Sequence, residues 1–144
     1  MDILRGLASV PDSFAETGTV VTIGVFDGVH RGHQLLISKA VETARGAGAP
    51  CVVMTFDPHP VTIFAPNRAP RALMPLEERA RHIADLGVDA LLVIDLRREI
   101  GGLTPTQYMN EVLVDTLHAR HVLVGENFTF GRDAAGTATT MAQL

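Results

Sequence analysis

Short apolar segments alternate with longer amphipathic ones along most of the chain. Four of the apolar segments are rich in β-branched residues, as expected for strands: Thr19–Phe26, Cys51–Phe56, Ala90–Ile94 and His121–Val124. Nearly continuous apolar strands are typical of a parallel sheet that is buried on both faces by helices. The pattern therefore predicts an α/β fold.

Helical periodicity fills the intervals between these strands. Apolar residues recur at helical spacing over Arg31–Arg45, over Leu76–Leu86, and from Thr104-Pro105 to about His118. Thr104 followed by Pro105 is typical of an N-cap and a first helical residue. The succession of strand–helix units predicts a Rossmann-like, doubly wound parallel sheet. The tail from Gly136 to Leu144 is compatible with the start of another helix.

Composition narrows the class of protein. The chain is 47% hydrophobic and 19% charged, which suffices for one core and excludes a disordered protein. Its net charge of −4 argues against nucleic-acid binding by phosphate neutralisation. Without an apolar run near ~20 residues or a signal-peptide pattern, we expect a cytoplasmic protein with no membrane partner. Cys51 lies in an apolar segment and is expected to be buried and inert.

The residues after the first predicted strand are the strongest candidates for chemistry. Gly24 to His33 reads Gly-Val-Phe-Asp-Gly-Val-His-Arg-Gly-His and leads into a predicted helix, whose N-terminus favours an anion. His30 and His33 are three residues apart and project to the same side of that helix start. Imidazoles donate hydrogen bonds and carry a proton near neutral pH, which suits phosphoryl or nucleotidyl transfer. A chance surface pair and a metal site stay open as alternatives.

Three motifs, in this order, resemble those of the prokaryotic FAD synthetases. They are Gly24–His33, Thr-Phe-Asp-Pro-His-Pro at 55–60, and Gly-Glu-Asn-Phe-Thr-Phe-Gly at 125–131. The first is similar to the adenylyltransferase motif of the nucleotidyltransferase superfamily, with its His-x-Gly-His core. The resemblance covers nearly the whole chain. It implies the nucleotidyltransferase fold and a reaction in which Mg-ATP and FMN give FAD and pyrophosphate.

The resemblance also implies roles for individual residues. His30 and His33 would contact the phosphates of ATP and act in catalysis. The residues expected to bind ATP are Gly24, Phe26, Asp27, Gly32 and Asn127, where many family members have Asp in place of Asn127. The residues expected to bind the flavin are Phe56, Pro58, His59, Phe64 and Phe128. A core position is the alternative for Phe56 and for at least one of Phe128 and Phe130.

The implied partners are small molecules: ATP with Mg²⁺, FMN as substrate and FAD as product. No metal ligands from the chain are expected, and the sequence leaves homo-oligomerisation open. The chain departs from the family pattern because a later Ser-Ser-Thr-x-x-Arg motif and a riboflavin kinase module are not found in it. We therefore expect residues 1–144 to be an FMN adenylyltransferase domain that is incomplete at its C-terminus.

Two other functions stay open from the sequence. The first is a non-catalytic module that binds a nucleotide or a flavin. The second is an adenylyltransferase that acts on another phosphate-bearing acceptor.

Overall fold

The sheet consists of five parallel strands. The computed structural model describes residues 1–24, 26, 29, 31–56, 75–95, 102–125, 129–130 and 136–137. The strands are β1 (Asp2–Arg5), β2 (Thr19–Ile23), β3 (Cys51–Phe56), β4 (Ala90–Ile94) and β5 (Ala119–Val124). They lie in the order β1-β4-β3-β2-β5. Every residue of β2, β3 and β4 is buried, as nearly continuous apolar runs require.

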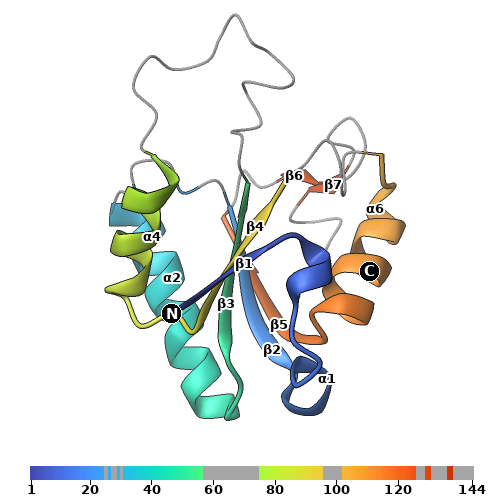
Figure 1. Cartoon of the computed structure of the whole chain (residues 1–144), viewed down its shortest axis with the longest axis horizontal. Helices are drawn as coiled ribbons and strands as arrows, with labels where there is room; N and C mark the ends of the chain where they lie inside the picture. Colours follow the sequence, from blue (N-terminus) through green and yellow to red (C-terminus); the bar gives the residue numbers. More distant parts are fainter. Residues whose placement is uncertain are drawn as a thin grey trace, which may run out of the picture.

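Helices cover both faces of this sheet. The helices α2 (Arg31–Ala47) and α4 (Leu76–Ala84) lie on one side, as Figure 1 shows. The other side carries η1 (Leu7–Ser9), α1 (Phe14–Thr17), α6 (Pro105–Gln107) and η3 (Tyr108–Thr116). Strand side chains alternate between two core clusters, so that Met54 packs with Tyr108 whereas Val53 packs with Ile37. The predicted α/β class with a doubly wound parallel sheet is confirmed.

Several element boundaries differ from the prediction. Strand β1 was not predicted, because it is a four-residue edge strand with mostly exposed side chains. Strand β2 ends at Ile23 instead of Phe26. Two further short strands, β6 (Thr129–Phe130) and β7 (Gly136–Thr137), form an antiparallel pair. The helix considered for the tail therefore does not begin at Gly136.

The helix between β4 and β5 begins at the predicted N-cap and then changes from α to π geometry. Thr104 and Gln107 form a reciprocal capping box: the Gln107 N–H donates to Thr104 Oγ1 at 3.2 Å, and the Thr104 N–H donates to Gln107 Oε1 at 2.9 Å. From Tyr108 to Thr116 the helix has π geometry. The Leu117 N–H accordingly donates to the carbonyl of Val112, five residues earlier, at 3.1 Å.

Cys51 is fully buried at the amino end of β3, as the sequence predicted. Burial raises the pKa of its thiol to about 12, and the nearby Asp89 carboxylate adds to this effect. The reactive species of cysteine is the thiolate. The thiol is therefore protonated at neutral pH and chemically inert.

We predict that a disulfide-exchange reagent leaves Cys51 unmodified in the folded protein at pH 8 and modifies it fully in guanidinium chloride. The pKa of the Cys51 thiol is about 12 in the folded protein and 9.0 in the unfolded chain. This difference stabilises the folded state fully below pH 9.0, and the stabilisation is lost as the pH rises toward about 12. Alkaline denaturation curves of the wild type and Cys51→Ala measure that loss. Rapid labelling of the native protein at pH 8 would contradict the prediction.

Candidate functional site

The sheet reverses its strand order between β2 and β5. The chain passes from β2 to its neighbour β3 and on to β4, and then returns to place β5 on the other side of β2. Ile23 at the end of β2 pairs with Val124 at the end of β5. Ligands of doubly wound sheets bind beyond the carboxyl ends of strands at such a reversal. Two of the three motifs therefore start side by side, at Gly24 and Gly125.

The turn after β2 is held by close packing of Phe26 on Gly24. The Gly24 N–H donates to the carbonyl of Met54 at 3.1 Å, which keeps this residue against the end of β3. A Cβ atom at Gly24 would lie 2.9 Å from Cζ of Phe26, closer than side chains tolerate. Phe26 itself is only 2% exposed. This packing requires a glycine at position 24.

The backbone of the turn is strained at two residues. Phe26 has a φ of 55° and Val29 a φ of 42°, a left-handed region that costs roughly 1–3 kcal/mol per non-glycine residue. Burial of both side chains offsets this cost. Two hydrogen bonds also contribute, from the Val29 N–H to the Phe26 carbonyl at 3.1 Å and from Gln34 Nε2 to the Val29 carbonyl at 3.0 Å. Backbone strain of this kind clusters at functional sites.

His33 is placed by the same turn. It lies in the first turn of α2, is partly exposed, and meets the ring of Phe26 edge to face, with centroids 5.2 Å apart and planes at 89°. Edge-to-face packing fixes the orientation of an aromatic ring. The N–H groups of a first helical turn have no partners within the helix and attract anions. His33 therefore lies at a helix start that favours anions, with its ring packed edge to face on Phe26.

The other residues singled out in the sequence divide into two groups. Gly32 lies exposed in the first turn of α2, beside His33. Phe56 ends β3, is only 7% exposed and packs in the core cluster. Seven residues lie outside the described part of the chain: Asp27, His30, Pro58, His59, Phe64, Asn127 and Phe128. The structure thus brings Gly24, Phe26, Gly32 and His33 together.

The chain is similar to known proteins along most of its length. The family model described as FAD synthetase matches residues 13–144. The chain belongs to the FAD synthetase family. It is 38% identical over 136 residues to the bifunctional riboflavin kinase/FMN adenylyltransferase of Escherichia coli K12, covering 94% of this chain and 43% of that protein. It is 36% identical over 124 residues to the protein of the same name from Bacillus subtilis, covering 85% of this chain and 39% of that one.

A solved structure shares the fold of this FAD synthetase family member. It is the crystal structure of a protein named as a macrolide-efflux protein, from Streptococcus pneumoniae. The two superpose with a TM-score of 0.80 at 26% identity, covering 99% of this chain and 47% of that one. The chain spans less than half the length of the curated relatives it matches. No helix in the described part of the chain is long and apolar enough to cross a membrane.

Arg79 of α4 lies at the same sheet edge and was not singled out in the sequence. It is only 4% exposed, and its Nη1 donates to Thr55 Oγ1 at 3.3 Å and to the Phe56 carbonyl at 3.5 Å. The available signal was a charged residue on the buried side of a predicted amphipathic helix, next to Ala80 and Ile83.

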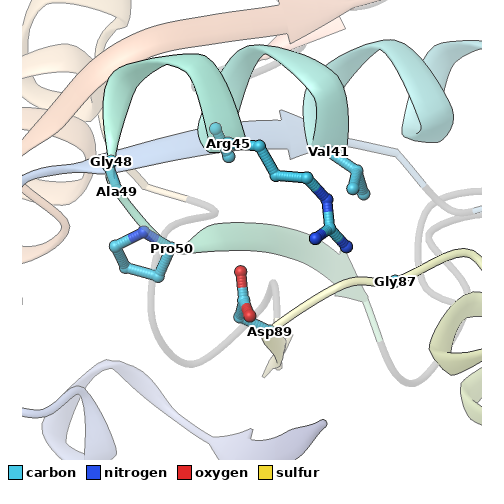
Figure 2. A pocket seen from close by; sticks show the side chains of 8 residues that line it. Val41, Arg45, Gly48, Ala49, Pro50, Gly87 and Asp89 are labelled. Atoms are coloured by element: carbon cyan, nitrogen blue, oxygen red, sulfur yellow. The ribbon is translucent and has the colours of Figure 1, made fainter.

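The opposite end of the sheet carries a separate hollow of about 390 Å³. It lies where α2 ends and β3 and β4 begin, and Figure 2 shows the side chains of Arg45 and Asp89 directed into it. Asp89 also caps β3, because its Oδ2 accepts a hydrogen bond from the Cys51 N–H at 2.8 Å. This hollow lies at the amino ends of the strands, away from the strand reversal, and is not the candidate site.

We predict that Gly24→Ala destabilises the protein by about 1–3 kcal/mol, because its Cβ overlaps the ring of Phe26. The matched control is Gly46→Ala in the exposed part of α2, where a Cβ meets nothing within 4 Å. Alanine favours a helix over glycine, so the control should gain up to about 1 kcal/mol. Urea unfolding measures both changes. Equal stability of the two variants would show that the Phe26 packing does not hold the turn.

Proposed function

We propose that this chain transfers AMP from Mg-ATP to FMN, giving FAD and pyrophosphate. Its membership of the FAD synthetase family over residues 13–144 carries this proposal. The names of its relatives, bifunctional riboflavin kinase/FMN adenylyltransferase, supply the acceptor. The strand reversal beside Gly24, with an anion-attracting helix start next to it, supports a nucleotide site at this place.

The phosphates of ATP would lie at the start of α2. His33, oriented by Phe26, and His30, three residues earlier, would donate hydrogen bonds to phosphate oxygens. Donors fixed in advance stabilise the charge that develops in the transition state without reorganisation. Glycine at positions 24 and 32 lets the nucleotide approach the backbone. Asp27 and Asn127 complete the proposed ATP-binding set.

The chemistry is a direct displacement at phosphorus. A phosphate oxygen of FMN forms a bond to the α-phosphorus of ATP, the bond from that phosphorus to the α,β-bridging oxygen breaks, and pyrophosphate leaves with the electron pair. Mg²⁺ would enter with ATP and neutralise phosphate charge, as it does in phosphoryl transfer generally. Among the described residues no group of three or more His, Cys, Asp or Glu side chains could hold a metal ion.

The flavin would lie beyond the end of β3. We propose Phe56, Pro58, His59, Phe64 and Phe128 for this side of the site. A flat conjugated ring gains from aromatic and apolar contacts, which these side chains can supply. We also propose a cytoplasmic location, where ATP and FMN are both present.

Incubation of the chain with FMN, ATP and Mg²⁺, followed by chromatography, tests the proposal directly. We expect FAD to form. His30→Ala and His33→Ala should each lower turnover by about 10²–10³-fold, the scale of a lost transition-state donor. The matched control is His82→Ala, since His82 is exposed on α4. It should retain wild-type turnover.

Two outcomes would contradict this function. Binding of FMN and ATP without FAD formation by the wild type would indicate a non-catalytic binding module. Release of pyrophosphate with another phosphomonoester but not with FMN would indicate a different acceptor.

A further inference from the structure

Arg79 places a charge inside an apolar layer. It lies on the face of α4 that packs against the sheet, beside Leu76, Ala80 and Ile83, and is 4% exposed. Removing a guanidinium from water costs several kcal/mol unless polar partners compensate. An apolar side chain of similar length would avoid that cost. The presence of a buried arginine at this position is therefore best explained by the hydrogen bonds that its guanidinium donates.

The guanidinium holds the last two residues of β3. Its Nη1 is shared between Thr55 Oγ1 at 3.3 Å and the Phe56 carbonyl at 3.5 Å. The backbone of Arg79 is fixed in turn, because its N–H donates to the Pro75 carbonyl at 3.0 Å in the first turn of α4. Arg79 thus ties the start of α4 to the carboxyl end of β3.

The end of β3 borders the candidate site on one particular side. Met54 pairs with Ile23 and accepts a hydrogen bond from the Gly24 N–H, so Thr55 and Phe56 extend beyond the point where β2 turns away. Strand β3 lies on the opposite side of β2 from β5. The strand reversal, where we place the ATP phosphates, therefore lies on the β5 side of β2, whereas the end of β3, where we place the acceptor, lies on its other side.

We propose that Arg79 is a positioning residue for the acceptor: by fixing the backbone at Thr55 and Phe56, it sets the affinity for FMN and leaves the affinity for ATP largely unchanged. This inference rests on the proposed function. Arg79 acts by holding the end of β3 in place.

Separate titrations of the two ligands test this proposal. Quenching of flavin fluorescence gives the Kd for FMN, and calorimetry gives the Kd for Mg-ATP. We expect Arg79→Met to weaken FMN binding about 10-fold, the scale of lost hydrogen bonds from a charged group, and to change ATP binding less than about twofold. Arg79→Lys keeps the positive charge and an N–H donor group, and should recover part of the FMN affinity.

Two further variants keep the test decisive. Thr55→Val preserves shape, removes the hydroxyl that accepts from Arg79, and should weaken FMN binding by about threefold. The matched control is Arg81→Met on the same helix, where Arg81 is exposed, and it should bind both ligands as the wild type does.

The proposal is wrong if folded Arg79→Met and Thr55→Val bind FMN as tightly as the wild type. It is also wrong if FMN and ATP affinities fall equally in step with the melting temperature, because that pattern marks a purely structural residue. In both cases the wild type still binds FMN, so the proposed function survives. A wild-type chain that binds ATP but not FMN would overturn both.

Discussion

The ring of Phe26 packs closely on Gly24 and also meets the ring of His33, and the rest of the site depends on these two contacts. Because a Cβ atom at Gly24 would lie 2.9 Å from the ring, any side chain larger than hydrogen at this position would force Phe26 to shift. The closed turn ends β2, forces a positive φ on Phe26 and Val29, and starts α2 at a fixed place. His33 consequently meets Phe26 edge to face in a single orientation.

The strand order determines what this turn faces. Because β5 returns to the far side of β2, Gly125 follows the strand whose last residue pairs with Ile23, although about a hundred residues separate the two in the chain. On the other side of β2, Arg79 fixes the end of β3. In the proposed function, the ATP phosphates take the β5 side of β2 and the acceptor takes the β3 side.

The elements buried on both faces were the most predictable from the sequence. Strands β3 and β4 have the predicted bounds. A short, continuously apolar run must be buried on both faces, and a central strand of a parallel sheet provides that burial. Strand β1 escaped prediction because an exposed edge strand has no such run. The predicted first strand extended to Phe26, whereas β2 ends at Ile23. Phe26 is apolar and buried as a strand residue would be, but its ring packs back on Gly24 in the turn that follows the strand.

The site was only partly predictable. The motif from Gly24 to His33 indicated a nucleotide site, because a helix start favours anions and imidazoles can donate hydrogen bonds to phosphate oxygens. The packing of Phe26 on Gly24 could not be read from residue types, since it depends on a left-handed backbone. Arg79 had no local signal for its partners, as Thr55 lies 24 residues earlier and is brought near only by the packing of α4 on β3.

The most direct test of the account is the side-chain NMR signal of His33 during titration with Mg-ATP, assigned by comparison with His33→Gln. The account predicts that the imidazole nitrogen resonances of His33 shift in proportion to nucleotide bound, whereas those of the exposed His82 stay in place. Saturation with Mg-ATP that leaves His33 unshifted, with changes instead around Arg45 and Asp89 at the other end of the sheet, would contradict it.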